Sequence, residues 1–228
     1  MNLKIDYCSY KAALYSVKHW HYSKSLPCSK RFMLGVWENE IFVGSIVFAV
    51  GNTPDLGRKY NIGKYEVCEL SRVALNKHET PVSKLLKIAL IILKKDNPKL
   101  KLIISFADSN QNHLGIIYQA MNWIYSGLTD KSKIWIYKGK EYHTRSVTAR
   151  GYVNHYGKMS KCPKPSECDQ ILQKPKFRYL YPLNKEMRKQ ILKLAKPYPK
   201  DLKCVSGVNG STSVFQTEGK VQIHSDAQ

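Results

Sequence analysis

The chain has 228 residues and 43% of them are hydrophobic, which is typical of one globular domain with extensions and not of a disordered protein. Lysine and arginine outnumber aspartate and glutamate by 37 to 17, and because this excess of +20 is larger than solubility requires, we expect a polyanionic partner. The longest apolar run is too short to cross a bilayer, and the N-terminal residues lack the apolar stretch of a secretory signal, so we expect a cytosolic protein.

The first part of the chain alternates helix and strand signals. Small apolar residues at helical spacing predict a first helix that ends near His21. Two apolar runs on either side of a polar turn predict an antiparallel hairpin over residues 32–51. The segment EVCELSRVAL, residues 66–75, predicts a further strand.

A second helix and a buried strand follow. Thr80 can cap a helix and Pro81 suits its first position, so a helix is predicted from there to about Lys95. The run KLKLIISFA predicts a strand in the middle of a sheet, and Asp108 ends it. With a helix over about His113–Trp123 and a strand in IYSGLT, the order of elements predicts an α/β fold with a mixed sheet flanked by helices.

The last part of the chain is more basic. KIWIYKGKEYHTRSV predicts a hairpin that turns at Lys138–Lys140, KFRYLYPL predicts a strand, and Asn184 is expected to cap a final helix. Residues 201–228 are polar and rich in small residues, which predicts a disordered tail. We therefore expect one domain over residues 1–200, with a basic insertion at about 130–175.

The charge is concentrated in one stretch. Residues 130–200 carry 18 basic and 5 acidic side chains together with nine aromatic residues. Cations neutralise phosphates and aromatic rings stack on unpaired bases, so this composition favours nucleic-acid binding. The alternative is a solvated cationic face that covers aromatic core residues.

The six cysteines do not form a CxxC pair. Structural zinc sites usually contain closely spaced ligand pairs. We therefore expect free thiols in a reducing compartment and no structural zinc.

Several polar residues stand where a site could form. Ligands of open α/β sheets bind at the carboxyl ends of strands, where Asp108 is expected, although an aspartate there can equally cap the next turn. Tyr118 is either a core residue or a proton donor or ligand beside Asp108. His21 and Tyr22 close the first helix, where a surface or core role is the alternative. Residues 76–84, NKHETPVSK, precede a helix and form either an anion site that includes Ser83 or a simple cap.

Four segments of the chain resemble the phage Mom proteins. They are HYS at residues 21–23, ELSRVAL at 69–75, SFADSNQNHLGIIYQAMNWIYSG at 105–127, and KFRYLYPL with the later PYPK. The resemblance spans about residues 10–200. It implies a fold like that of the GCN5-related N-acetyltransferases and an enzyme that converts adenine in phage DNA to a carbamoylmethyl form, which host restriction enzymes cut poorly.

The resemblance also implies roles for individual residues. Asp108 and Tyr118 match the proposed active-site acid and tyrosine of the family, and His21 and Tyr22 match its HY pair. For cofactor binding, Ser83 matches the serine of the cofactor loop, and Ser71 and Arg72 lie in the matching strand. Glu69 belongs to the same strand but is given no role. The residues expected to contact DNA are His143, Arg145, Arg150, Lys176 and Arg178.

The donor of the modifying group stays open. Acetyltransferases of this fold usually have a glycine-containing loop that lets backbone amides approach the pyrophosphate of coenzyme A, whereas residues 76–84 contain no glycine. An acyl-CoA-type donor and a different donor are both alternatives. Iron held by His21, Asp108 and Tyr118 is a further candidate, because imidazole, carboxylate and phenolate bind iron.

Adenine N6 in a duplex is paired and stacked, so the resemblance implies an enzyme that extrudes the base or acts on opened DNA in the host cytoplasm. Two other functions remain as alternatives. One is a nucleic-acid-binding protein with an inactive transferase fold, in which Asp108 and Tyr118 are structural. The other is an ordinary acyl-CoA-dependent N-acyltransferase. A membrane partner is not expected, and the oligomeric state is open.

Overall fold

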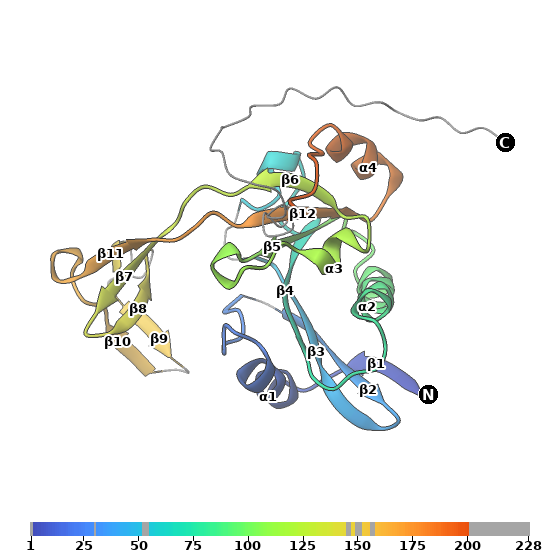
Figure 1. Cartoon of the computed structure of the whole chain (residues 1–228), viewed down its shortest axis with the longest axis horizontal. Helices are drawn as coiled ribbons and strands as arrows, with labels where there is room; N and C mark the ends of the chain where they lie inside the picture. The colour runs from blue at the N-terminus through green and yellow to red at the C-terminus, as the bar shows by residue number, and fades with distance from the viewer. Residues whose placement is uncertain are drawn as a thin grey trace, which may run out of the picture.

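One mixed β-sheet runs through the body of the molecule (Figure 1). The computed structural model describes residues 2–29, 31–51, 55–144, 147–148, 152–155 and 158–200. The sheet has the strand order β1-β2-β3-β4-β5-β12-β6, and its strands are β1 (Leu3–Tyr7), β2 (Arg31–Glu38), β3 (Ile41–Ala49), β4 (Val67–Leu75), β5 (Leu102–Ala107), β12 (Phe177–Pro182) and β6 (Ile124–Leu128). β4 and β5 pair in parallel, and the other neighbouring pairs are antiparallel.

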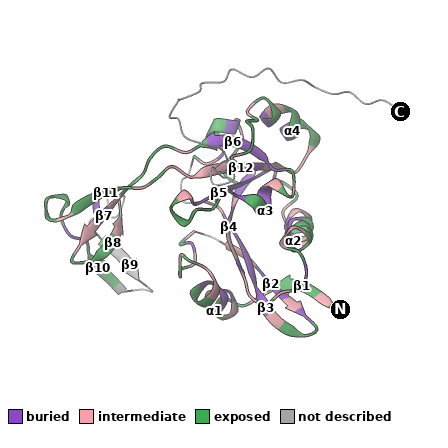
Figure 2. Cartoon of the chain, in the orientation of Figure 1, coloured by how far each residue is buried: buried purple, intermediate pink, exposed green. Residues whose placement is uncertain are grey.

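Helices cover both faces of this sheet. They are α1 (Tyr10–Trp20), α2 (Val82–Asp96), α3 (Ile116–Gln119) and α4 (Lys185–Leu192), with short 3-10 turns at Arg58–Tyr60 and Ser109–Gln111. Because side chains alternate along a strand, Ile103 of β5 packs in the core beneath α2 while Ile104 packs against Ile191 of α4. The buried residues gather in the central strands (Figure 2). None of the described helices is long and apolar enough to cross a membrane.

The predicted fold class, a mixed α/β sheet flanked by helices, is confirmed. The first helix, the hairpin of β2 and β3, the strand before Asp108 and the helix capped by Asn184 are all present. The Asn184 side chain accepts a hydrogen bond from the Met187 N–H at 2.8 Å. The edge strand β1 was not predicted.

Two local predictions are wrong. The helix expected over residues 113–123 is a single turn, α3, because Gly115 before it and Asn122 after it have left-handed backbone angles, with φ of +78° and +54°. Thr80 does not cap α2. Pro81 occupies the cap position without a side-chain hydrogen bond, and the Thr80 N–H donates to a carboxylate oxygen of Glu38.

The parallel pair β4–β5 separates part-way along the sheet. The strands pair over three positions, from Val67 opposite Leu102 to Glu69 opposite Ile104. Beyond Glu69, β4 continues beside β3 to Leu75, whereas β5 continues beside β12 to Ala107. The divergence opens a gap in the sheet at the carboxyl ends of these strands, which is where ligands of α/β folds bind.

A separate β-structure projects from the body between β6 and β12 (Figure 1). We call residues 133–172 the arm. It contains β7 (Lys133–Tyr137), β8 (Lys140–His143) and β11 (Asp169–Leu172) in one sheet, and β9 (Tyr152–His155) and β10 (Lys158–Lys161) in another. The predicted turn at Lys138–Lys140 is confirmed, whereas β9 to β11 were not predicted. The predicted disordered tail, residues 201–228, lies outside the described residues.

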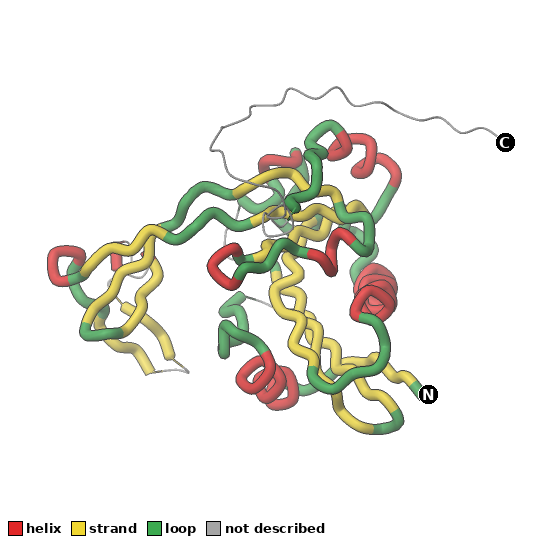
Figure 3. The backbone as a smooth tube through the Cα atoms, in the orientation of Figure 1, coloured by secondary structure: helices red, strands yellow, loops and turns green. Residues whose placement is uncertain are grey.

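Two extended segments, residues 129–132 and 173–176, join the arm to the body and run side by side (Figure 3); we call them the stalk. The Thr129 N–H donates to the Lys176 carbonyl and the Gln173 N–H to the Ser132 carbonyl, each at 2.8 Å. Arm and stalk together, residues 129–176, carry 11 basic and 4 acidic residues.

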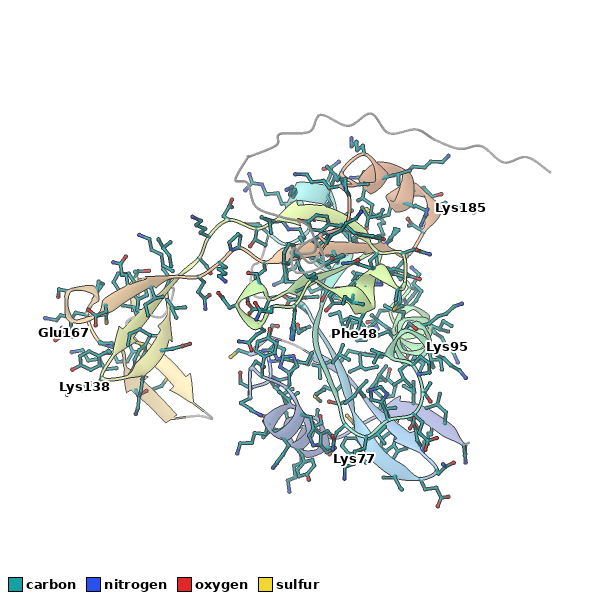
Figure 4. All side chains as sticks on the ribbon, viewed as in Figure 1. Phe48, Lys77, Lys95, Lys138, Glu167 and Lys185 are labelled. Carbon is teal, nitrogen blue, oxygen red and sulfur yellow. The ribbon has the colours of Figure 1, made fainter. Side chains whose placement is uncertain are left out.

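The aromatic residues of the basic stretch serve two purposes. Trp135 and Tyr179 are buried, at 6% and 0% exposure, and are core residues, as the alternative reading of this stretch expected. Tyr152 in the arm is half exposed and remains available to a partner. The labelled Lys138 and Glu167 lie on the arm, well away from Phe48 in the core of the body (Figure 4).

Candidate active site

A cavity of about 840 Å³ opens where β4 and β5 diverge. This volume is within the range of roughly 300–1,000 Å³ that is usual for ligand pockets. Its walls come from the end of α1, from β4, from the end of β5 and from the α3 region, and they comprise Trp20, His21, Tyr22, Ser23, Leu56, residues 69–73, residues 106–108, residues 112–118 and Lys176.

The cavity brings together residues that are distant in the sequence. Seven predicted site residues line it: His21, Tyr22, Ser71, Arg72, Asp108, Tyr118 and Lys176. Ser83 does not line it, because it lies in the first turn of α2. Arg178 lies in β12 and interacts with Tyr60, away from the cavity. His143 belongs to β8 but its side chain is not described, and Arg145 and Arg150 lie outside the described residues.

Asp108 is both a cap and a cavity residue. One carboxylate oxygen accepts the Asn110 N–H at 3.0 Å, and the other lies 3.0 Å from Lys176 Nζ and 3.4 Å from the Tyr22 hydroxyl. Burial opposes ionisation of this group, but hydrogen bonding and charge from Lys176 outweigh it and hold the pKa of Asp108 below its usual value. Asp108 is therefore an ionised acceptor at neutral pH.

The stalk is attached directly to the Asp108 turn. The Ser109 hydroxyl donates to the Pro175 carbonyl at 2.7 Å, and the Lys176 N–H donates to the Thr129 hydroxyl at 2.9 Å. The side chain of Lys176 then reaches Asp108. The position of this carboxylate is consequently linked to the base of the arm.

Glu69 is a cavity residue that the sequence analysis did not choose as a site residue. It occupies the last parallel-paired position of β4, and its carboxylate accepts a hydrogen bond from the Ser71 hydroxyl at 3.2 Å. Burial raises the pKa of Glu69 above its ordinary value, although Ser71, Arg72 and Lys176 partly offset this effect. An acidic residue in an otherwise apolar strand of the predicted sheet was the available signal. A carboxylate of raised pKa in a cavity is suited to accept a proton.

Tyr118 lines the cavity but is only 8% exposed. Its hydroxyl lies 2.7 Å from the Ser105 hydroxyl, which in turn lies 2.8 Å from the Leu70 carbonyl. A carbonyl can only accept and a serine hydroxyl has one proton, so Tyr118 donates to Ser105 when Ser105 donates to Leu70. Burial raises the pKa of Tyr118 to about 12. The phenol is thus neutral and is hydrogen-bonded to Ser105, the serine that links β5 to β4.

His21 and Tyr22 form an aromatic wall of the cavity. Their rings stack with centroids 4.4 Å apart, and the ring of His113 meets Tyr22 edge-on at 5.6 Å. His21 Nδ1 lies 2.9 Å from the Ser23 hydroxyl and 3.1 Å from the Ser23 backbone nitrogen, so Ser23 fixes the orientation of the ring. Burial, together with Arg72, lowers the pKa of His21 to about 4. Burial and the charge of Asp108 raise the pKa of Tyr22 to about 12. Both rings are uncharged at neutral pH.

Arg72 is a fixed cation at the cavity wall. Its Nε donates to the Ser25 carbonyl at 2.9 Å and its Nη1 donates to the Ser71 carbonyl at 2.7 Å. Burial lowers the pKa of Arg72 from its ordinary value, but an arginine remains charged in proteins. The guanidinium therefore supplies a positive charge of defined orientation.

The described residues give no support to the predicted iron site. Among them, no group of three or more histidine, cysteine, aspartate or glutamate side chains is arranged to hold a metal ion. The hydroxyl of Tyr118, the third predicted ligand beside His21 and Asp108, is engaged in a hydrogen bond with Ser105.

The cofactor residues implied by the resemblance lie in two different places. Residues 76–84, which include Ser83, contain no glycine, and none of them is among the residues that line the cavity. Ser71 and Arg72 do line it.

Solved structures similar to this chain include three acetyltransferases. A GNAT family enzyme from Elizabethkingia anophelis with acetyl-CoA bound has 12% identity and a TM-score of 0.42, and the match covers 80% of this chain and 99% of that one. A probable acetyltransferase from Staphylococcus epidermidis has 11% identity, a TM-score of 0.47, and coverage of 80% and 100%. An acetyltransferase from Bacillus subtilis in complex with CoA has 11% identity, a TM-score of 0.42, and coverage of 80% and 100%.

Comparison with curated protein sequences gives no match. The family model described as the Mom protein family matches residues 2–200. This match includes the whole seven-stranded sheet, the cavity and the arm. The chain therefore belongs to the Mom protein family.

Proposed function

We propose that the chain is a DNA-modifying transferase that converts adenine to an N6-carbamoylmethyl form in phage DNA and so protects that DNA from host restriction. The observation that carries the proposal is the pair of carboxylates, Glu69 and Asp108, in an open cavity at the base of a cationic arm. Membership of the Mom family supports a transferase, and the adenine substrate follows from the resemblance of the active-site segments.

The target base has to leave the duplex before it can react. Extrusion costs a few kcal/mol of stacking and pairing. The stacked rings of His21 and Tyr22 offer an aromatic surface at the cavity on which an extruded purine could lie. Because both rings are uncharged at neutral pH, they accept a flat base without the cost of burying a charge.

The two carboxylates have different roles in this proposal. Asp108, which stays ionised, accepts a hydrogen bond from one N6 hydrogen and orients the amine. Glu69 takes the other N6 proton as N6 forms a bond to the methylene carbon of a carbamoylmethyl donor. The bond from that carbon to its leaving group breaks at the same time, and the leaving group departs with the electron pair. Arg72 stabilises negative charge that develops on the donor.

The arm and stalk supply the DNA contacts. Their 11 basic and 4 acidic residues favour the phosphate backbone, and backbone contacts position DNA without reading its sequence. The stalk lysine Lys176 lies between the arm and Asp108, so phosphates held along the stalk would approach the cavity. DNA in the host cytoplasm is therefore the partner that we propose.

Mass analysis of nucleosides tests the function. DNA co-expressed with the wild-type chain should contain a new adenine derivative, which should be lost in Asp108→Ala and Glu69→Gln and kept in Asp55→Ala, an exposed aspartate outside the cavity. Unmodified DNA from all four strains would contradict the proposal. DNA binding without modification would favour a binding protein with an inactive transferase fold, and acylation of a protein or small amine would favour an ordinary N-acyltransferase.

A further inference from the structure

The loop between β4 and α2 is packed against the tip of the β2–β3 hairpin. β4 ends at Leu75, and the Asn76 N–H donates to the Val43 carbonyl of β3 at 2.9 Å. The hairpin turns at Asn39 and Glu40, both of which have left-handed backbone angles with φ of +49° and +68°. This tight turn presents the preceding residue of β2, Glu38, to the loop.

The Glu38 carboxylate is bound by the loop backbone. Its Oε2 accepts the Glu79 N–H at 2.7 Å and its Oε1 accepts the Thr80 N–H at 2.8 Å. The side chain is buried, at 5% exposure. The Glu79 N–H and the Thr80 side chain are the largest influences that hold the pKa of Glu38 below its usual value. An internal anion thus occupies two amides of the loop that precedes a helix.

We infer that Glu38 is an internal substitute for a bound phosphate: it closes the β4–α2 loop to anions, so that a phosphate-bearing donor is held by the cavity cations Arg72 and Lys176. The inference goes beyond the proposed function because it assigns the part of the fold that holds the donor. The groups that recognise the donor are then the guanidinium of Arg72 and the ammonium of Lys176, not the backbone amides of a loop.

Three features keep an external anion away from the start of α2. Pro81 has no N–H to offer. The amides of Val82 and Ser83 follow within three residues of Thr80, next to a carboxylate that repels phosphate. A phosphate that displaced Glu38 would first have to break two charge-assisted hydrogen bonds, those from the Glu79 and Thr80 amides.

The cavity offers the opposite electrostatics. Arg72 lines the cavity and is fixed by hydrogen bonds to two backbone carbonyls. Lys176 also lines the cavity, and its ammonium group can interact with a ligand and with Asp108 at the same time. β4 beyond Glu69 has no parallel partner on the side of β5, so an extended donor can lie along it. Ser71 and Arg72 are then the cofactor residues, and Ser83 is not.

Amide NMR of the full chain with coenzyme A and, separately, inorganic pyrophosphate tests this assignment. The amide chemical shifts around Ser71 and Arg72 should change in a saturable way. The chemical shifts of the Glu79, Thr80, Val82 and Ser83 amides should change no more than they do when salt is added to the same ionic strength. Absence of any saturable shift around Ser71 and Arg72 up to millimolar ligand would contradict the assignment of the donor to the cavity cations. Saturable shifts of the four loop amides would overturn the closure of the loop.

Two variants provide an independent readout by calorimetry with coenzyme A. Ser83→Glu places a negative charge in the first turn of α2 and should leave the affinity within twofold of wild type, whereas Arg72→Gln should lower it at least tenfold. The reverse pattern would overturn the inference. Neither measurement depends on a modified nucleoside, so failure of the proposed function, which is read from DNA, remains distinguishable from failure of this assignment.

Discussion

Lys176 Nζ lies 3.0 Å from Asp108 Oδ2, and this contact ties the base of the arm to the end of the central strand β5. The lysine side chain is 36% exposed and the aspartate side chain 9% exposed. A phosphate near the stalk can therefore compete for the lysine, whereas the carboxylate remains fixed by its turn. Binding of DNA by the stalk would change the charge that Asp108 experiences.

Lys176→Met should destabilise the protein by about 1 kcal/mol at pH 7, because the pair is only partly buried. Asp108 has a lowered pKa, so its stabilising contribution is present above its unfolded pKa and is lost as the pH falls through the folded pKa. The difference between variant and wild type in urea unfolding should thus shrink below about pH 4. Lys174→Met, on the same stalk but exposed, is the control; an equal loss in both variants would contradict a specific pair.

Glu69→Gln should separate activity from stability. Loss of a general base should lower the modification rate by about a hundredfold or more. The raised pKa means that ionised Glu69 costs stability at pH values above its folded pKa, so the melting temperature of the variant should equal or exceed that of wild type. Glu66→Gln, which removes a surface pair with Lys101, should keep the wild-type rate. An unchanged rate in Glu69→Gln would exclude its role as a base.

Tyr118→Phe tests a structural role against the catalytic role implied by the family resemblance. Removal of the buried hydroxyl leaves Ser105 with one partner fewer, so the free energy of unfolding should fall by about 1 kcal/mol. The modification rate should fall less than tenfold, and less than in Tyr22→Phe, whose hydroxyl reaches Asp108. A hundredfold loss of rate with unchanged stability would restore Tyr118 as a catalytic residue.

His21 should make the protein sensitive to mild acid. Its pKa falls from 6.5 to about 4 on folding, so between these pH values the unfolded chain takes up a proton that the folded chain does not. Stability should decrease as the pH is lowered through this range. His21→Asn should remove part of that decrease in urea unfolding measured from pH 7 to 4. Identical pH dependences would show that His21 does not contribute.

DNA binding should depend steeply on salt. A protein that makes six to ten phosphate contacts typically loses at least about a thousandfold in DNA affinity when the salt concentration rises from ~50 to ~200 mM. Lys138→Glu and Lys140→Glu in the arm should each reduce the slope by about one, whereas Lys95→Glu on α2, distant from the arm in Figure 4, should not. A uniform effect of all three changes would point to net charge alone.

Much of the fold could be predicted from patterns that are local in the sequence. The apolar runs of β2 and β3 on either side of a polar turn, the apolar run of β5 and the Asn184 cap are decided by neighbours in sequence, so they could be predicted. The helix expected at residues 113–123 failed because Gly115 and Asn122 adopt left-handed conformations that shorten it to one turn. The strand β1 is stabilised by pairing with β2, a distant partner that no local pattern reveals.

The site was predictable where a residue ends an element. Asp108 closes an apolar strand and His21 closes a helix, and both line the cavity. Glu69 was harder to identify, because its role arises from the divergence of β4 and β5, which is a property of the sheet. The same holds for Lys176, whose ion pair depends on the return of the chain from the arm.

The stalk leaves and re-enters the body at adjacent points, since Thr129 and Lys176 are hydrogen-bonded to each other. A short turn between them would connect β6 and β12 as an ordinary hairpin and leave the seven-stranded sheet unbroken. The arm thus contributes no strand to the seven-stranded sheet, and a chain shortened at this junction would measure how much of the proposed DNA binding the arm provides. In the same way, arms of different length could be exchanged at this junction to alter which polymers reach the cavity.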